Sequence, residues 1–331
     1  MEERKQDHIS LAFQSRIGQA QQDKRFAYEP MLRAHPSGDL LKTPFLGKSL
    51  GAPIWISSMT GGTSLARKIN THLAQAANEF GLGMGLGSCR IVMDNEKYLP
   101  DFDLRPIIGD ALPLYANLGI AQLETRLARN DLQAVHDLVS TLRADGLIIH
   151  VNPMQEWLQP EGDLLRHPPL DTLRHFLAQA NYPVIVKEVG QGFGLESMRE
   201  LLKLKLAAVE FAAFGGTNFA KVELLRNLET SRELYEPLSY IGETAEDMLA
   251  SLNTLAQGPQ DSFQTPEVII SGGLRSFLDG YYFIQKSKYP AIYGMASTFL
   301  KYAKEDYSAL HEFTKNQIRG LQMAYTFLKV K

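Results

Sequence analysis

A short apolar run followed by a helix-like segment recurs eight times along this chain, and this repeat constrains the fold more than any other feature. Strands that alternate with helices pair in parallel, because parallel neighbours need a crossover connection. In a chain of 331 residues, eight such units predict an α/β fold of the (β/α)₈ TIM-barrel type rather than a doubly wound sheet. The runs lie at residues 53–59, 81–88, 112–119, 146–152, 183–190, 207–216, 267–273 and 291–296.

Three amphipathic stretches between these runs, 65–81, 123–146 and 197–206, have helical periodicity. In the first, one face should carry Leu65, Ile69, Leu73, Ala76 and Ala77. No linker-like tract divides the chain, so we predict a single domain over residues 1–331. Two parts lie outside the repeat. Residues 1–52 form an N-terminal arm and lead-in, and about 217–266 form a long insertion between the sixth and seventh strands, as two helices or as a helix and a lid.

Composition excludes several classes of protein. The chain is 44% hydrophobic and 21% charged, with a formal net charge of −3, which is typical of a globular protein and gives no basis for nucleic-acid binding. Cys89 is the only cysteine, so an intrachain disulfide is impossible and we expect a reducing compartment. The charged start is unlike a signal peptide, and no run approaches the roughly 18 apolar residues of a membrane span. We therefore expect a cytoplasmic protein.

The most polar strand end is "HVNPMQEWLQPEGD", residues 150–163, which is typical of neither a strand nor a helix. In a barrel the loops after the strands form the catalytic face, so such an end is a candidate site. Ligand-type residues also close the other runs, in "MTGG" (59–62), "GSCR" (87–90), "ANLG" (116–119), "KEVGQGFG" (187–194), "GGTN" (215–218), "SGGLR" (271–275) and "GMAS" (294–297).

The last two runs end in "SGGLRSF" and "YGMASTF", each before a helix-like segment. Glycines allow the backbone to approach an anion, and the start of a helix favours negative charge. Either motif alone is explained by a tight turn at Gly272, Gly273 or Gly294. The two in this order favour a phosphate site, which recurs on these loops of barrels.

Two further features bear on a planar cofactor. The glycines of "GLGMGLG" alternate, which indicates either close packing or room for a flat ligand above the barrel; they are Gly81, Gly83, Gly85 and Gly87. Lys187 ends "VIVK" within the fifth run, where it either makes a structural ion pair or faces N1 and the C2 carbonyl of a flavin.

The polar strand end also suggests a metal-assisted phosphate site. Mg²⁺ commonly takes one or two protein carboxylates and completes its shell with water and phosphate oxygens, so Glu156 is a candidate ligand. Asn152 and Gln155 are uncharged and would position a substrate. Cations for a diphosphate are available beside Ser88 and on the arm, at Arg90, Arg4, Lys5 and His8. Together these features indicate a flavin barrel that acts on a phosphorylated substrate.

Motifs in order from residue 4 to residue 296 resemble those of the FMN-dependent type 2 isopentenyl-diphosphate δ-isomerases. They are "RKQDHI", "MTGG", "GLGSCR", "HVNPMQEWLQPEGD", "PVIVKEVG", "GGTN", "SGGLR" and "GMA". The resemblance implies FMN, Mg²⁺ and interconversion of isopentenyl and dimethylallyl diphosphate. It also implies a homo-oligomer and a reductant such as NADPH, which reduces the flavin without being consumed in turnover.

The resemblance also assigns residues. Gln155 would be catalytic, orienting the alkene end of the substrate while the flavin N5 carries the proton, and Glu156 would bind Mg²⁺. The substrate would be held by Arg4, Lys5, His8, Ser88, Arg90, His150, Asn152 and Gln155. FMN would contact Met59, Thr60, Gly61, Ser88, Asn117, Lys187 and Thr217, and its phosphate end would contact Gly272, Gly273, Arg275, Met295 and Ala296.

Three positions depart from the family pattern. Ala212 stands where a serine is frequent, Cys89 where a glutamine is frequent, and Asn218 belongs to "GGTNF" where the family often has "GGTSW". We expect Cys89 to be structural. Two other functions stay open on the residues. One is another FMN-dependent barrel oxidoreductase, such as a 2-hydroxy-acid oxidase with His150 as its base. The other is a non-catalytic barrel that binds a phosphorylated metabolite.

Overall fold

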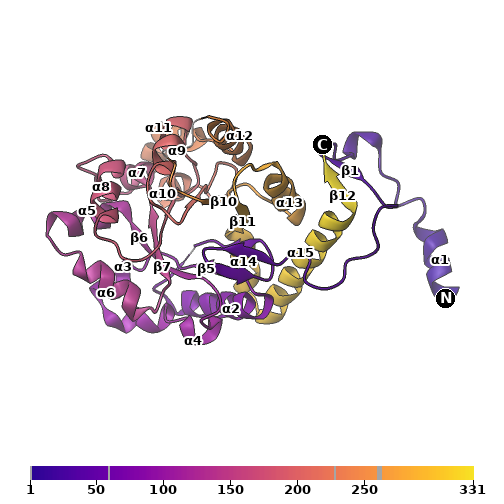
Figure 1. Cartoon of the computed structure of the whole chain (residues 1–331), viewed down its shortest axis with the longest axis horizontal. Coiled ribbons are helices and arrows are strands. Elements are labelled where there is room, and N and C mark those ends of the chain that lie inside the picture. The colour runs from indigo at the N-terminus through magenta and orange to yellow at the C-terminus, as the bar shows by residue number, and fades with distance from the viewer. Residues whose placement is uncertain (1, 59, 227–228, 259–262) are drawn as a thin grey trace.

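Eight parallel strands close into a barrel in the computed structural model, which describes residues 2–58, 60–226, 229–258 and 263–331. Neighbours in the barrel follow the chain order, with the last strand pairing with the first (Figure 1). The predicted TIM barrel is therefore confirmed. The strands are β4 (Ile54–Ile56), β5 (Gly83–Gly85), β6 (Leu114–Gly119), β7 (Gly146–His150), β8 (Val184–Lys187), β9 (Ala208–Glu210), β10 (Glu267–Ser271) and β11 (Ala291–Met295).

Helices connect these strands and cover the barrel. The predicted amphipathic stretches 65–81 and 197–206 each coincide largely with one helix, whereas 123–146 contains parts of two helices with a break at 129–132. Leu65 is 51% exposed, because the buried face of the first helix is centred on Ala66, Ile69 and Leu73 and leaves Leu65 at its edge. The helices up to β9 are α2 (Ser64–Phe80), α3 (Arg90–Asp94), η2 (Glu96–Asp101), α4 (Arg105–Ile108), α5 (Ile120–Ala128), α6 (Gln133–Thr141), α7 (Pro153–Leu158), α8 (Pro169–Leu177) and α9 (Leu195–Leu202). Those after β9 are α10 (Phe219–Arg226), α11 (Glu229–Tyr235), η3 (Glu236–Tyr240), α12 (Ala245–Leu255), α13 (Phe277–Lys286), α14 (Ser297–Ala303) and α15 (Tyr307–Phe327).

Large aromatic side chains fill the barrel interior. Trp55 and Tyr115 meet edge to face, with ring centroids 6.0 Å apart. A Cβ atom on Gly83 would lie 2.5 Å from the Trp55 ring, and one on Gly85 would lie 2.5 Å from Ile148. The alternating glycines therefore serve close packing, and the alternative of room for a flat ligand is wrong at Gly83 and Gly85.

The insertion between β9 and β10 differs from the prediction. Its last helix, α12, packs against α9 and α13 and is the regular outer helix of its βα unit. The added structure is thus α10, α11 and η3, and α10 packs against α7. The predicted boundary at 266 was too far along the chain, because a barrel helix and an insertion helix have the same amphipathic pattern.

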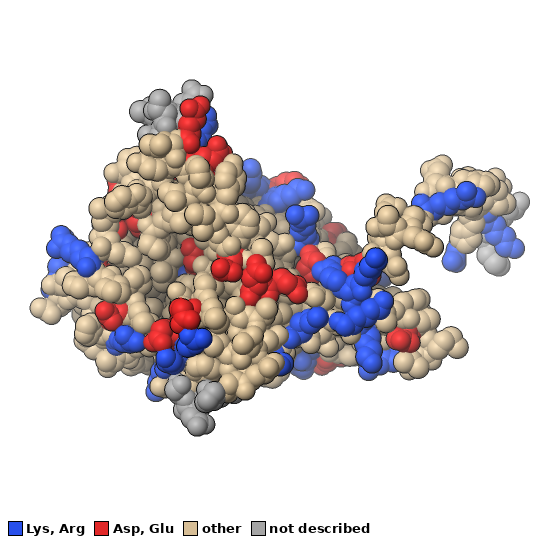
Figure 2. All heavy atoms as spheres, turned by 90° about the horizontal axis from the view of Figure 1, so that it is seen from above, with Lys and Arg blue, Asp and Glu red and all other residues tan. Residues whose placement is uncertain are grey.

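The first 52 residues divide into an arm and a cap. Helix α1 (Glu2–Leu11) extends away from the barrel, followed by η1 (Gln19–Gln21) (Figures 1 and 2). Strand β1 (Phe26–Tyr28) then pairs with the C-terminal strand β12 (Leu328–Val330). The hairpin of β2 (Thr43–Phe45) and β3 (Lys48–Leu50) covers the amino ends of the barrel strands. There Lys48 Nζ donates to Asp145 Oδ1 (2.6 Å), just before β7, and Leu46 N donates to Glu267 Oε2 (2.9 Å) at the start of β10.

Among the described residues, no helix has both the length and the apolar character needed to cross a membrane.

Candidate active site

Two adjoining cavities lie at the carboxyl ends of the strands. The larger, of about 290 Å³, is lined by residues that follow β4 and β8 to β11. The smaller, of about 130 Å³, reaches the ends of β5, β6 and β7. Four residues line both cavities, so the two share part of their walls; these are Ser58, Lys187, Val189 and Phe219. We call them the cofactor cavity and the substrate cavity, after the roles proposed below.

The two predicted phosphate loops face the cofactor cavity together with residues after β9. Gly272 and Gly273 have φ angles of 92° and 73°, a conformation that favours glycine. A Cβ atom on Gly272 would lie 2.2 Å from Ala213 N, so the backbones of these loops touch. Of the residues assigned to the cofactor, this cavity brings together Lys187, Thr217, Gly272, Gly273, Arg275, Met295 and Ala296.

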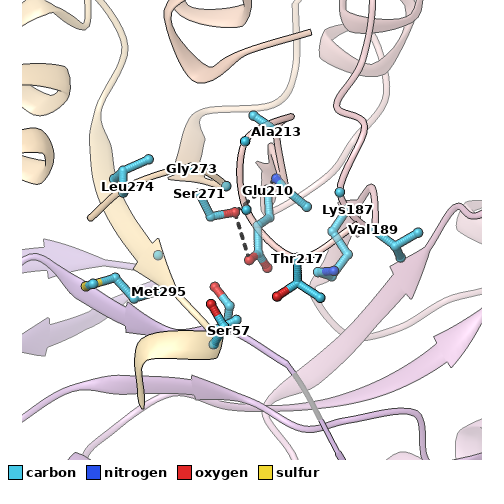
Figure 3. Close-up of a pocket in the computed structure, with 18 of the residues that line it drawn as sticks. Ser57, Lys187, Val189, Glu210, Ala213, Thr217, Ser271, Gly273, Leu274 and Met295 are labelled. Carbon is cyan, nitrogen blue, oxygen red and sulfur yellow. Dashed lines mark hydrogen bonds between the residues drawn. The ribbon is translucent and has the colours of Figure 1, made fainter. Parts of the chain in front are cut away.

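The floor of the cofactor cavity is polar and incompletely hydrogen-bonded (Figure 3). Lys187 and Glu210 lie opposite each other on β8 and β9, and both are buried. Within the described residues, three buried oxygens on this floor have no hydrogen-bond partner: Ser57 Oγ, Ser58 Oγ and Glu210 Oε2. Buried polar atoms are almost always paired in proteins, so this floor fits a ligand with several ring heteroatoms.

The buried Lys187 also acts on the substrate cavity. Its Nζ donates to the carbonyl oxygen of Glu188 (2.7 Å). Burial, and secondarily the charge of Lys187, lower the pKa of His150 to about 3. The imidazole of His150 is therefore neutral near pH 7.

A chain of hydrogen bonds orients the neutral His150. Asn117 Nδ2 donates to the Leu86 carbonyl (3.0 Å), which turns Asn117 Oδ1 toward His150 Nδ1 at 2.7 Å. Nδ1 therefore carries the proton and Nε2 keeps its lone pair. Asn117, assigned to FMN from the sequence, lines the substrate cavity and uses its amide to hold His150.

Gln155 lines the substrate cavity from the first turn of α7. Asn152 Nδ2 donates to Gln155 Oε1 (3.1 Å) and to Glu156 Oε1 (3.0 Å). Gln155 Nε2 in turn donates to Glu223 Oε1 on α10 (3.0 Å). The amide is thus held at both ends. The segment 150–163, typical of neither element in the sequence, contains a short helix that begins with Pro153.

Glu223 is a site residue that the sequence analysis missed. It is buried on the face of α10 that also buries Ala220 and Leu224. The sequence contained a signal for this residue, because Glu223 lies on the apolar face of a predicted helix. A carboxylate at such a position indicates a specific partner, since a charge is rarely buried without one.

Glu156, the predicted metal ligand, is buried and bound to its own loop. Its Oε2 accepts a hydrogen bond from Asp163 N (2.8 Å). The side chain of Asp163 then accepts from Arg90 (2.8 Å) and Gln122 (3.0 Å). The part of the chain that the structure describes contains no group of three or more His, Cys, Asp or Glu that could hold a metal. Each Glu156 oxygen keeps a second lone pair, so the residue fits Mg²⁺ held mainly by water and substrate.

The structure does not bring every predicted ligand to the cavities. Ser88 lines the substrate cavity, and the Arg90 side chain is 53% exposed beside Asp163. The exposed helix α1 carries the remaining predicted cations, and it lies away from the barrel in both views (Figures 1 and 2); these cations are Arg4, Lys5 and His8. In this arrangement these three residues are not among the described residues that line the two cavities.

The structure gives packing contacts for part of the predicted cofactor loop "MTGG". Met59 lies outside the described residues. A Cβ atom on Gly61 would lie 2.0 Å from the Phe102 ring, so packing alone requires this glycine. Thr60 presents its backbone to Gly87, whose Cβ would lie 2.3 Å from the Thr60 carbonyl oxygen. Thr60 and Gly61 are not among the described residues that line the two cavities.

Each departure from the family pattern has a structural context. Ala212 has a φ of 44°, and its N–H donates to Ser271 Oγ (3.0 Å), so Ser271 supplies a hydroxyl beside it. Cys89 is buried, and burial raises the pKa of its thiol to about 12, which agrees with a structural role. Asn218 accepts from Lys221 N (2.9 Å) at the start of α10, and its amide donates to Ser239 O (3.1 Å).

Comparison with known proteins gives relatives over nearly the whole chain, although no protein-family model matches it. The chain is 36% identical over 314 residues to the isopentenyl-diphosphate delta-isomerase of Rickettsia peacockii, covering 94% of this chain and 88% of that protein. It is 35% identical over 307 residues to the protein of the same name from Rickettsia prowazekii, covering 91% and 86%.

Solved structures share the fold at low sequence identity. The flavin-binding domain of baker's yeast flavocytochrome b2 aligns with a TM-score of 0.59 at 12% identity, covering 89% of this chain and 71% of that chain. A mandelate oxidase variant with an FMN adduct aligns with a TM-score of 0.55 at 13% identity, covering 93% and 88%.

Proposed function

Because this chain belongs to the isopentenyl-diphosphate delta-isomerase family, we propose that it interconverts isopentenyl and dimethylallyl diphosphate, using FMN and without net oxidation. The enzyme is an isomerase. One observation supports the proposal at the level of single residues. The amide of Gln155 is held by Asn152 and Glu223 and lines the substrate cavity. This cavity adjoins the glycine-lined cofactor cavity.

FMN fits the cofactor cavity. Gly272, Gly273 and Arg275 line one part of it and would hold the phosphate, while Lys187 lies on the floor and would meet the polar edge of the ring. When bound and reduced, FMN supplies an electron-rich ring that stabilises positive charge and exchanges a proton. Reduction would come from a donor such as NADPH.

The side chains of this protein would orient the alkene, and they would leave the proton transfer to the flavin. Moving a double bond requires a proton to be added at one carbon and removed at another. An amide such as that of Gln155 is neither acid nor base near neutral pH, so its role would be to position the substrate. The neutral His150 would accept a hydrogen bond at Nε2 without adding a positive charge next to a carbocation-like centre.

The diphosphate would lie at the mouth of the substrate cavity. Ser88 lines that cavity and Arg90 is exposed beside Asp163, while Glu156 would hold Mg²⁺ with water and phosphate oxygens. Arg4, Lys5 and His8 would add charge if the arm moves or if the arm of a second copy reaches the site. We propose a cytoplasmic homo-oligomer.

The decisive experiment is steady-state isomerisation with FMN, Mg²⁺ and a reductant, in deuterated water. We expect dimethylallyl diphosphate carrying deuterium, little activity with oxidised FMN, and the release of FMN, not FAD, on denaturation. FAD, or no conversion under reducing conditions, would sink the proposal.

The alternative is oxidation of a 2-hydroxy acid, with the unprotonated His150 Nε2 as base. The fold shared with flavocytochrome b2 and mandelate oxidase is compatible with it. Flavin reduction by lactate or mandelate would support this alternative, whereas the isomerase should leave the flavin oxidised.

Substitution of Glu156 tests the metal site. In Glu156→Gln we expect activity to fall at least tenfold and the dependence on Mg²⁺ to flatten, with FMN still bound, because the residue lies outside the cofactor cavity. The measurements are a Mg²⁺ titration of activity and the flavin content of the purified variant. Loss of flavin with normal activity after FMN is added back would contradict the assignment.

A further inference from the structure

The buried carboxylate of Glu210 is a feature that neither the sequence analysis nor the family assignment uses. Glu210 ends β9, has no exposed surface, and lines the floor of the cofactor cavity. Its Oε1 accepts a hydrogen bond from Ser271 Oγ (3.1 Å), while its Oε2 has no partner within the described residues. Removing a carboxylate from water is unfavourable unless its oxygens are paired, so the free Oε2 requires a hydrogen-bond donor.

The described residues around Glu210 use their donors elsewhere. The Ser271 hydroxyl accepts from Ala212 N and donates to the other oxygen of Glu210. Lys187 Nζ donates to the carbonyl oxygen of Glu188 (2.7 Å). Ala212 and Ala213 continue the same wall of the cavity and have no polar side-chain atoms. The donor for Glu210 Oε2 is therefore expected on the ligand.

The position of Glu210 around the barrel indicates which part of a ligand would meet it. Strand β9 lies between β8 and β10. Glu210 is in register with Lys187 on β8 and with Ile269 on β10. Strand β10 continues through Ser271 to the loop at Gly272, which would hold the phosphate. Glu210 thus stands between Lys187 and the phosphate loop.

FMN has a fixed order of groups along this line. Its N1, which Lys187 would meet, lies on the side of the ring that carries the ribityl chain, and this chain ends in the phosphate. A flavin with N1 at Lys187 and its phosphate at Gly272 and Gly273 must therefore lead its ribityl chain past Glu210. The ribityl hydroxyls are hydrogen-bond donors, as the free carboxylate oxygen requires.

A second unpaired oxygen lies on the same path. Ser57 is buried directly after β4, and its Oγ has no hydrogen-bond partner within the part of the chain that the structure describes. A Cβ atom on Gly294 of β11 would lie 2.6 Å from Ser57 Oγ and 2.9 Å from Ser271 Cβ, so the two serines flank this glycine. Figure 3 shows Glu210 and Ser57 directed into the same part of the cavity.

We propose that Glu210 and Ser57 form a polyol site for the ribityl chain. One ribityl hydroxyl donates to Glu210 Oε2, and another pairs with Ser57 Oγ. The proposal rests on FMN being the cofactor, bound in the direction that Lys187 and the phosphate loop set. Both residues thereby recognise the cofactor by selecting a hydroxylated chain between its ring and its phosphate.

The polyol site is tested with an FMN analogue in which an unsubstituted pentyl chain replaces the ribityl chain. This analogue keeps the ring and the phosphate and lacks the hydroxyls. A site built for hydroxyls rejects a ligand without them, because buried polar groups are then left unpaired. We expect the wild-type protein to bind FMN at least about tenfold more tightly than the analogue, by fluorescence titration.

Three variants relate this affinity ratio to single residues. Glu210→Leu removes the charged acceptor and should lower the ratio at least about tenfold. Ser57→Ala removes one neutral hydrogen bond and should lower it about threefold. Glu124→Gln is the matched control, because Glu124 is a buried carboxylate on α5 that accepts from Arg166 N and His167 N, outside both cavities. It should leave the ratio unchanged.

Each result has one meaning. A wild-type preference for FMN below about threefold, or an unchanged ratio in Glu210→Leu, overturns the proposal while FMN binding and isomerase activity stand. An unchanged ratio in Ser57→Ala removes Ser57 from the site. If Glu210→Leu does not fold, as judged by circular dichroism, Glu210→Gln decides, because its weaker neutral acceptor should still lower the ratio about threefold. Failure of the wild-type protein to bind FMN overturns the proposed function and this proposal together.

Discussion

Gln155 is held from two directions, by Asn152 on the same turn and by Glu223 on another helix. A side-chain amide has several rotamers, and two hydrogen bonds to buried partners select one of them. A fixed amide position is required if Gln155 acts by orienting the substrate rather than by transferring a proton.

We expect Gln155→Asn to lower kcat steeply and to change KM little. Shortening the side chain by one methylene withdraws the amide, and misplacement on the order of 1 Å can cost about 10²-fold in rate. The measurement is steady-state kinetics with reduced FMN at saturating Mg²⁺. Gln179→Asn, on an exposed segment after α8, is the matched control. A normal kcat with a greatly raised KM would show that Gln155 only binds.

His150 gives the site a specific pH dependence of stability. Its folded-state pKa of about 3 lies below the ordinary value of 6.5, because burial and Lys187 disfavour the charged imidazole. The unfolded chain therefore binds more protons between these pH values, and the folded state loses stability as the pH falls from about 6.5 to 3.

We expect His150→Gln to lose less stability than the wild-type protein on acidification. Between pH 8 and pH 5 the difference in the free energy of unfolding should be about 2 kcal/mol in favour of the variant. Urea denaturation at the two pH values measures it. His175→Gln, on the exposed part of α8, is the control and should follow the wild-type protein. Identical pH dependence of His150→Gln and wild type would mean that folding does not lower the pKa of His150.

At the scale of elements, helix α10 connects the insertion to the site. A small hydrophobic cluster joins α7 and α10 through Leu158, Ala220 and Leu224. Asn218 ties the start of α10 to Ser239, and Glu223 reaches Gln155 from the same helix. The insertion therefore positions the substrate cavity and is more than a decoration of the barrel.

We expect Leu224→Ala to reduce kcat while FMN affinity stays unchanged. The deletion removes buried contacts between α7 and α10, at a cost on the order of 2 kcal/mol in stability. The contact from Glu223 to Gln155 then loosens, whereas the phosphate loops are on other units. Kinetics and flavin titration separate the two effects. Leu225→Ala is the neighbouring control, since Leu225 is 61% exposed. Equal losses in both variants would contradict this account of α10.

At the scale of the whole molecule, one hydrophobic core connects the barrel strands, the outer helices and the lead-in. The β2–β3 hairpin closes the amino ends of the strands, and β1 pairs with β12 near the C-terminus. A shared hydrophobic core couples the unfolding of the elements that contribute to it. The predicted single domain is thus open to a direct measurement.

The two tryptophans provide that measurement, since Trp55 is fully buried inside the barrel and Trp157 is 65% exposed on α7. In Trp157→Phe, the fluorescence of Trp55 reports the barrel interior, and far-ultraviolet circular dichroism reports the helices. We expect the two unfolding curves to coincide, with bound FMN raising both midpoints equally. Separate midpoints would show that the barrel interior and the helices do not unfold as one unit.

The barrel, and the end of it where the candidate site lies, were predictable from the sequence alone. Each of the eight apolar runs, from 53–59 to 291–296, contains a barrel strand. The polar residues that follow each run mark the carboxyl end of its strand, and this order along the chain does not depend on tertiary contacts. The motifs around Gln155 and Glu156 also indicate the family, because they are local in the sequence.

Which side chains meet depends on the tertiary structure. Glu223 is 68 positions from Gln155 and Ser271 is 61 from Glu210, and no local pattern encodes these pairs. The sequence also did not predict that Trp55 packs against the glycine-lined strand. Nor did it predict the remote position of Arg4, Lys5 and His8. The physical reason is that strands and helices form from neighbouring residues, whereas contacts at a site depend on how separate elements pack in three dimensions.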